Sequence, residues 1–370
     1  MHVKERPLIS SAAGKLLGGG LPLWSFLCIA LLLGAASPGY CGPFDSLMTP
    51  DMKSLEARCR KGELSLCMSA GNIYRYGGQK VSQDVDKAIE LYGLGCSGGD
   101  SKCCHALYLI GFDDSRGKKG KKDMPRAAKV FGEACKGSPS GIYSGPACDE
   151  LAKLYLSGKA VKKDVPRGVD LLRRGCDRYS HPACRDLGDI LLEGSLVPKD
   201  VPGAVGAYRK ACDGKKPEQR ACMHLGMLFL TGEQVEKDIP SAEKYLTEAC
   251  AFPDQIGTAC YELARLYDSG LAGGKSAEEI TELYHVACDR AKTERSPRAC
   301  IAAAERHLEG KGAKKDPNWV SQLYSRGCMM KDRESCRLSC EWTCKRGQPD
   351  ACAAVKSGRI PIGASNCFKP

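Results

Sequence analysis

Hydrophobic and polar positions follow a fixed order along most of the chain, and the stretch from Cys148 to Cys176 shows this order most clearly. Leu151 follows the first cysteine by three positions, Gly158 closes the apolar segment, and Asp164 opens the next one. A glycine suits the left-handed residue that ends a helix, and Asp followed by Val-Pro is typical of a helix entrance. The pattern therefore predicts two helices joined by a polar turn, a helix–turn–helix hairpin.

This unit repeats along the chain. Its two cysteines are 28 positions apart in five copies, which begin at Cys148, Cys184, Cys222, Cys260 and Cys300. Two looser copies begin at Cys67 and Cys104, with separations of 29 and 31. A repeat of this length is typical of a solenoid, in which each unit contacts only its neighbours. We expect an all-α fold, an α/α solenoid of about seven helix–turn–helix repeats over residues 56–327, and a cysteine-rich C-terminal cap at 328–370.

The shared columns, which also include a large residue four positions before the second cysteine such as Tyr208, resemble the Sel-one-like repeats. These are relatives of the tetratricopeptide repeat, and the closest resemblance is to their cysteine-rich secreted members, the Hcp-type proteins. The resemblance covers roughly residues 55–355 and implies a right-handed superhelix with a concave face that binds proteins or peptides. The copy at Cys260 departs from the pattern, with Gly274-Lys275-Ser276 in place of Lys-Asp, so we expect its second helix to begin less regularly.

The N-terminus predicts export. Basic residues precede an apolar run from Leu21 to Leu33, and small residues follow at 34–36, which is the order of a secretory signal peptide. We predict a signal peptide at 1–36, a flexible lead-in at 37–55, and a periplasmic or secreted mature protein without a transmembrane segment. The alternative is a lipid anchor at Cys41, which the bulky Tyr40 disfavours. The 23 cysteines in 370 residues agree with an oxidising compartment.

The cysteines at the ends of neighbouring units are expected to pair. Spacing inside the units is nearly constant, so the variable separations of eight to thirteen belong to the connecting loops, which we call junctions. A disulfide across each junction would staple one hairpin to the next. The predicted pairs are Cys59–Cys67, Cys96–Cys104, Cys135–Cys148, Cys176–Cys184, Cys212–Cys222, Cys250–Cys260, Cys288–Cys300, Cys328–Cys336 and Cys344–Cys352.

Metal binding is the alternative use of these cysteines. Zinc sites favour cysteines separated by two to four residues, and the repeating gap is longer, so we expect neither a metal nor another cofactor. Four cysteines of the expected mature chain remain. Cys340 and Cys367 are candidates to tie down the tail, whereas Cys41 and Cys103 either pair with each other or are free.

The resemblance also raises an enzyme alternative, because Hcp-type relatives have been regarded as penicillin-binding proteins with weak β-lactamase activity. A serine enzyme of that class uses an S-x-x-K motif, and the chain has Ser115–Lys118 and Ser241–Lys244, about as many as chance provides. It has no S-D-N motif, and its histidines are scattered singly without H-E-x-x-H. We therefore expect no enzymatic activity, and weak β-lactam hydrolysis is the alternative function.

If first helices line the concave face, as the resemblance implies, their exposed residues are the candidate binding site. An ordinary solvated helix surface is the competing interpretation. The candidates are His105, Asp149, Lys153, Arg185, Asp186, His224, Tyr261, Glu262 and Arg265.

Lysines gather in the turns inside the units, at 118–119, 121–122, 162–163, 199, 237 and 314–315. Stacked units would align them in a basic ridge able to contact an anionic envelope surface, and soluble turns rich in lysine are the alternative. The net charge of +11 is moderate, and no aromatic residues interleave with these lysines, so nucleic acid is not an expected partner. The predicted function is an exported scaffold that binds a protein or peptide partner on its concave face.

Overall fold

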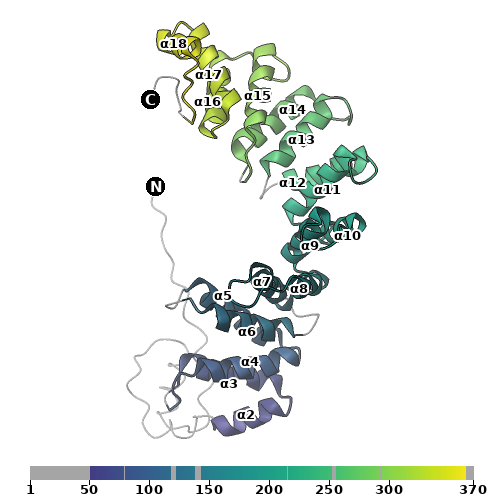
Figure 1. Ribbon diagram of the computed structural model, residues 1–370, viewed down its shortest axis with the longest axis vertical. Helices are drawn as coiled ribbons and strands as arrows, with labels where there is room; N and C mark the ends of the chain where they lie inside the picture. The colour runs from purple at the N-terminus through teal and green to yellow at the C-terminus, as the bar shows by residue number, and fades with distance from the viewer. Residues whose placement is uncertain are drawn as a thin grey trace, which may run out of the picture.

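The computed structural model describes residues 51–78, 80–117, 122–137, 143–214, 216–251, 256–291 and 293–363. Over these residues the chain forms helices and two isolated β-bridges, without a strand. The helices follow one another along a curved array, from α2 at one end to α18 at the other (Figure 1). The predicted all-α solenoid is thus confirmed, whereas the predicted signal peptide, Cys41 and Cys367 lie outside the described residues.

Each unit pairs a first helix with a second helix. The first helices are α3 (Leu64–Tyr76), α5 (Ser101–Arg116), α7 (Ser144–Ser157), α9 (His181–Glu193), α11 (Gln219–Thr231), α13 (Gly257–Asp268) and α15 (Pro297–Glu309). Their partners are α4 (Val85–Ser97), α6 (Met124–Cys135), α8 (Val165–Asp177), α10 (Val201–Cys212), α12 (Ile239–Cys250), α14 (Ala277–His285) and α16 (Pro317–Met329). The array also contains α2 (Met52–Arg60) at its start, and α17 (Arg333–Lys345) and α18 (Pro349–Ser357) within the expected cap.

Aspartates begin the second helices as predicted. The Asp164 carboxylate accepts from the backbone N–H of Arg167 at 3.0 Å, and the Asp200 carboxylate accepts from Gly203 at 2.9 Å. These contacts satisfy N–H groups that have no partner inside the helix. The same cap occurs at Asp84, Asp123, Asp238 and Asp316.

The two helices of a unit approach closely because a small residue faces the large one. Tyr208 of α10 is fully buried, and a Cβ added to Gly188 of α9 would lie 2.5 Å from its Cε1 atom. Leu246 of α12 lies over Gly226 of α11 in the same way, with a corresponding distance of 2.7 Å to its Cγ atom. Both glycines stand four positions after the first cysteine of their unit, so the first helix supplies the space that the large side chain fills.

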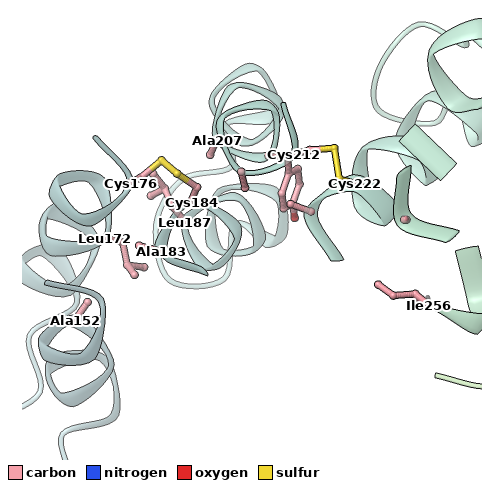
Figure 2. Packing of buried hydrophobic residues seen from close by; sticks show 14 of the residues in the cluster. Ala152, Leu172, Cys176, Ala183, Cys184, Leu187, Ala207, Cys212, Cys222 and Ile256 are labelled. Carbon is pink, nitrogen blue, oxygen red and sulfur yellow. A yellow bond between two sulfur atoms is a disulfide. The ribbon is translucent and has the colours of Figure 1, made fainter. Parts of the chain in front are cut away.

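All nine predicted junction disulfides are present, with Cα–Cα distances from 4.4 to 5.1 Å. Figure 2 shows two of them, Cys176–Cys184 and Cys212–Cys222, beside the buried layer that contains Leu172 and Leu187. Closing a loop of about ten residues stabilises the fold by roughly 2–3 kcal/mol in the chain-entropy model. Each bridge therefore fixes the end of one hairpin against the start of the next.

Two further cysteines are described. Cys103 has a free thiol that is fully buried, and burial raises its pKa to about 12. A thiol with this pKa is almost entirely protonated at neutral pH and is a poor nucleophile. Cys340 is disulfide-bonded, and the partner proposed for it, Cys367, lies outside the described residues.

The copy that starts at Cys260 is irregular at a different point from the one expected. Its second helix, α14, begins with a capping box, in which Ser276 and Glu279 exchange hydrogen bonds of 3.2 and 2.8 Å. This box replaces the aspartate of the other copies. The irregularity falls at the end of the helix, where α14 continues into a π-helical turn, η2 (Val286–Arg290).

None of the helices described between residues 51 and 363 has the length and apolarity that crossing a membrane requires.

Candidate functional site

Four of the predicted binding residues belong to one chain of ion pairs that crosses three units. Lys153 of α7 lies 2.9 Å from Asp149 and 3.9 Å from Asp186 of α9. Arg185 then contacts Asp186 at 2.5 Å and Glu218, the residue before α11, at 2.9 Å. We call these five residues the charge ladder. Glu218 was not among the predicted residues, because it lies in a junction, and the junctions differ in length from one unit to the next.

Asp149 is the buried end of the charge ladder, with 4% of its surface exposed. Its Oδ2 atom accepts a hydrogen bond from Lys153, whereas its Oδ1 atom is buried without a hydrogen-bond partner. Burial raises the pKa of Asp149 to about 6, against the opposing effect of the Lys153 ammonium. Buried carboxylates are normally fully hydrogen-bonded, so an orphan oxygen with a raised pKa marks a candidate functional site.

A groove of about 380 Å³ opens beside Asp149. The first helices α5, α7 and α9 contribute to it, together with the junction between α8 and α9. This volume is at the lower end of the range for ligand pockets, roughly 300–1,000 Å³, and suits one side chain with adjoining backbone. Its lining residues are Tyr108, Pro146, Asp149, Glu150, Lys153, Tyr179, Ser180, His181 and Pro182.

Tyr179, on the wall of the groove, has an unusual backbone conformation. Its φ is 61°, in the left-handed region, and its side chain is 81% exposed. At the corresponding position, the other four eight-residue junctions have Gly62, Gly99, Gly347 and Lys331, and Lys331 is left-handed as well, with a φ of 65°. A side chain in this conformation costs roughly 1–2 kcal/mol, which glycine avoids. Tyr179 can be recognised in the sequence by comparing the equivalent positions of the junctions, although it was not among the predicted binding residues.

The two histidines among the predicted site residues lie outside the groove lining and pack against aromatic rings. The His224 ring stacks on Tyr208 with centroids 5.3 Å apart, and its Nε2 atom lies 3.6 Å from Asp189. The Tyr208 hydroxyl donates to the same Asp189 carboxylate at 2.7 Å. His105 stacks on Tyr143 with centroids 3.9 Å apart. Both rings are partly exposed and are held by stacking.

The last three predicted residues form a separate group on α13. Arg265 pairs with Glu262 at 2.9 Å, and its guanidinium lies 5.7 Å from the centre of the Tyr261 ring. Tyr261 in turn contacts Tyr284 of α14, with ring centroids 6.0 Å apart. The nine predicted residues therefore occupy four places along the solenoid: the charge ladder, His105 on α5, His224 on α11 and the group on α13. Of the nine, Asp149 and Lys153 are the two that line the groove.

Two histidines that are far apart in the sequence meet in the structure. The Nε2 atoms of His285 and His307 lie 3.0 Å apart, and the Nδ1 atom of His307 is 3.0 Å from the Lys314 carbonyl oxygen. Trp319 stacks on His307, with centroids 5.9 Å apart. Burial and the neighbouring His307 lower the pKa of His285. The residues come from different helices and meet only through the stacking of units.

Across the described part of the chain, no group of three or more His, Cys, Asp or Glu side chains has the arrangement of a metal site.

The lysines of the turns occupy equivalent places in successive units. Lys163, Lys199 and Lys237 fold back over the glycine that ends the preceding helix, and a Cβ added to Gly194 would lie 2.8 Å from that of Lys199. Residues 118–121 lie outside the described residues. The other lysines of the predicted ridge are exposed, and they are Lys122, Lys162, Lys163, Lys199, Lys237, Lys314 and Lys315. The basic ridge itself stays a prediction.

The S-x-x-K candidate at Ser241 is engaged in helix capping. Its hydroxyl donates to the Asp238 carboxylate at 2.5 Å, and its backbone N–H donates to the same group at 3.1 Å. These hydrogen bonds lower the pKa of Asp238, which makes this carboxylate a weak base for activating the serine. Lys244 pairs with Asp213 at 3.1 Å. For the other candidate, Ser115, the matching Lys118 lies outside the described residues.

The stacked hairpins and their junction disulfides define the class of this protein, a helical-repeat solenoid that presents an extended surface. The model of the Sel1 repeat matches residues 65–100, 145–180, 181–215, 219–251, 257–279 and 297–318, which together make up half of the chain. The chain belongs to the Sel1 repeat family. Such a scaffold fits a protein-binding repeat protein, because Sel1 repeats mediate protein–protein interaction.

Two solved structures of bacterial proteins are similar to this chain. A Sel1 repeat protein from Oxalobacter formigenes is 18% identical, with a TM-score of 0.51 over 75% of this chain and 98% of that chain. A protective antigen of uropathogenic Escherichia coli with an SLR fold is 17% identical, with a TM-score of 0.42 over 85% of this chain and 76% of that chain. None of the curated proteins matches the sequence.

Proposed function

We propose that this protein is an exported scaffold that binds a peptide segment of a partner protein across its first helices. The observation that carries the proposal is the groove between α5, α7 and α9, which lies at the buried end of the charge ladder. Solenoids of this kind present a continuous surface built from equivalent helices, and a peptide laid along it meets several units at once. The groove provides depth at one point of this surface, and the charge ladder provides fixed polar groups beside it.

Export is the second part of the proposal. Nine bridges over residues 59–352 need an oxidising compartment, because cytosolic thiols are kept reduced. A basic start followed by the apolar run at 21–33 supports a cleaved signal peptide. Mass spectrometry of the secreted or periplasmic product tests this directly. The expected chain begins near residue 37, and an uncleaved or lipid-modified start contradicts cleavage there.

Peptide binding is tested with the oxidised protein and an array of random peptides, followed by affinity measurements in solution on the selected peptides. Arg185→Ala breaks the charge ladder at its centre and is expected to weaken binding by about tenfold. Lys210→Ala is the matched control, because it removes one exposed ion pair, with Asp177, from the second helices. Equal affinity for the Arg185→Ala variant and the wild type, or no selected peptide at all, contradicts the proposal.

The basic ridge supports a second contact, with an anionic envelope surface. Exposed lysines that recur at the same turn position add their charges along one direction, and attraction of this kind is screened by salt. Sedimentation with vesicles rich in anionic lipid is expected to show binding at low salt and a strong loss at moderate salt. Binding that does not depend on salt, or its absence at low salt, contradicts a role for the ridge.

A further inference from the structure

The groove already contains a cation supplied by the protein itself. The Lys153 ammonium lies 2.9 Å from Asp149, 3.3 Å from Glu150 and 3.9 Å from Asp186. Of these three carboxylates, Asp186 is also paired with Arg185. Within the groove lining, Lys153 thus faces two acidic groups, Asp149 and Glu150, so the lining carries more carboxylates than ammonium groups in a protein whose net charge is +11.

The pairing of Asp149 is incomplete. Lys153 serves its Oδ2 atom, while the buried Oδ1 atom accepts no hydrogen bond within the protein. A buried acceptor gains most from a donor that reaches it after folding, since its desolvation has already taken place. An ammonium donates along three separate directions, whereas a planar guanidinium donates to both oxygens of one carboxylate at once. Less than 1 Å² of the Oδ1 atom is exposed in the free protein, so a donor reaches it only when the side chains of Asp149 and Lys153 rearrange, and a guanidinium can then donate to both oxygens.

The walls of the groove suit the same chemical group. Tyr108 and Tyr179 both line it, and guanidinium planes stack on aromatic faces. Tyr179 is 81% exposed and keeps a left-handed backbone where three of the four other eight-residue junctions have glycine and the fourth has the flexible side chain of Lys331. Neither the packing of the fold nor the conformation of the junction calls for a tyrosine here. Contact with a ligand gives this side chain a role.

We propose that the groove binds an arginine side chain of the partner peptide, with its guanidinium on Asp149 and its plane against the ring of Tyr179. This inference rests on the proposed peptide-binding function and names the residue that the groove selects. Lys153 acts as a stand-in that occupies the acidic site in the free protein. When arginine enters, the Lys153 ammonium moves toward Glu150 and Asp186, which it already contacts.

The test uses three short capped peptides that differ at one central residue, which is arginine, lysine or citrulline. Citrulline has nearly the same shape as arginine without the charge, so it isolates the ion pair. Binding to the full oxidised protein is measured by NMR shifts up to millimolar peptide. We expect the arginine peptide to bind about tenfold or more tightly than the citrulline peptide, with lysine in between.

Three variants and one control variant assign the effect to the groove. Asp149→Asn is expected to remove the preference for arginine over citrulline, while Asp170→Asn, an exposed carboxylate on α8, leaves it unchanged. Lys153→Met removes the competing cation and is expected to tighten arginine binding. Tyr179→Gly suits the left-handed backbone, so weaker binding in this variant reports the lost ring contact and not misfolding.

Equal binding of arginine and citrulline peptides, or an unchanged preference in Asp149→Asn, overturns the inference. If peptides selected from the array bind across the first helices without a preference for arginine, the inference fails and the peptide-binding function stands. If no peptide from the random-peptide array binds and the arginine peptide does not bind either, the peptide-binding function and the arginine inference both fail.

Discussion

The raised pKa of Asp149 makes a quantitative prediction about stability. Its pKa is raised from 3.8 to about 6, so the folded state binds this proton more readily than the unfolded state does. The sign follows from this difference: ionised Asp149 destabilises the fold at neutral pH, and the penalty disappears as the pH falls toward 4. A shift of this size corresponds to about 3 kcal/mol at pH 7 and about half of that at pH 5.

The perturbation is Asp149→Asn, which keeps the shape of the side chain and removes its titration. We expect the free energy of unfolding of this variant, relative to wild type, to fall by about 1–2 kcal/mol between pH 7 and pH 5 as the wild type recovers. Urea unfolding at several pH values measures the difference, and carbon NMR of the carboxyl group measures the pKa itself. Asp170→Asn controls for the change in net charge.

A difference between variant and wild type that is constant with pH, or a carboxyl titration near 4, would refute the reasoning. Either result would mean that water or a donor reaches the Oδ1 atom of Asp149, and that the groove does not contain an unmet acceptor.

Three other predictions concern the fold. Gly188→Ala is expected to destabilise the protein by about 1–3 kcal/mol, because the new Cβ meets the Tyr208 ring. The control is Gly206→Ala on α10, where a Cβ meets nothing within 4 Å and alanine is expected to stabilise the helix by up to about 1 kcal/mol. If urea unfolding gives the same change in the free energy of unfolding for both alanine variants, the close packing of Tyr208 against Gly188 is contradicted. Replacing Cys176 and Cys184 together by serine is expected to lower the free energy of unfolding by about 2–3 kcal/mol. An unchanged free energy of unfolding contradicts a stabilising role for this disulfide. Because the folded-state pKa of His285 is lowered, stability is expected to fall as the pH drops below the ordinary value near 6.5. The protection factors of backbone amides in α14–α16, which correct for the slower intrinsic exchange at low pH, are then expected to fall at pH 5. Protection factors that fall equally in His285→Gln contradict the role of this histidine.

The sequence was sufficient for the fold because each local rule recurs with the repeat. An aspartate such as Asp164 caps its own helix, and a pair such as Cys176–Cys184 joins residues only eight positions apart. These features depend on neighbouring residues, so spacing alone predicts them. The entrance of α14 escaped the prediction because a capping box of Ser276 and Glu279 performs the task of the missing aspartate.

The candidate site was harder to predict because it depends on contacts between units. Asp149 and Lys153 are one helical turn apart, and their pairing is visible in the sequence, but the approach of Asp186 depends on how α9 packs beside α7. The burial of Asp149 and the contact of His285 with His307 depend on the same stacking. The prediction from equivalent repeat positions was wrong for Asp149, which was expected to be exposed and is buried, and it did not show which helices share a groove.

The positions of the nine junction disulfides determine which fragments stay covalently linked after proteolysis. The turn inside a unit, for example around Lys199 between α9 and α10, is spanned by no junction bridge, whereas a break at Arg178 is spanned by Cys176–Cys184. A protease that cuts after lysine would therefore release cross-linked two-helix fragments, each made of the second helix of one unit and the first helix of the next. The covalent building block of the oxidised protein is this straddling pair, and it is offset by one helix from the hairpin that the repeat defines.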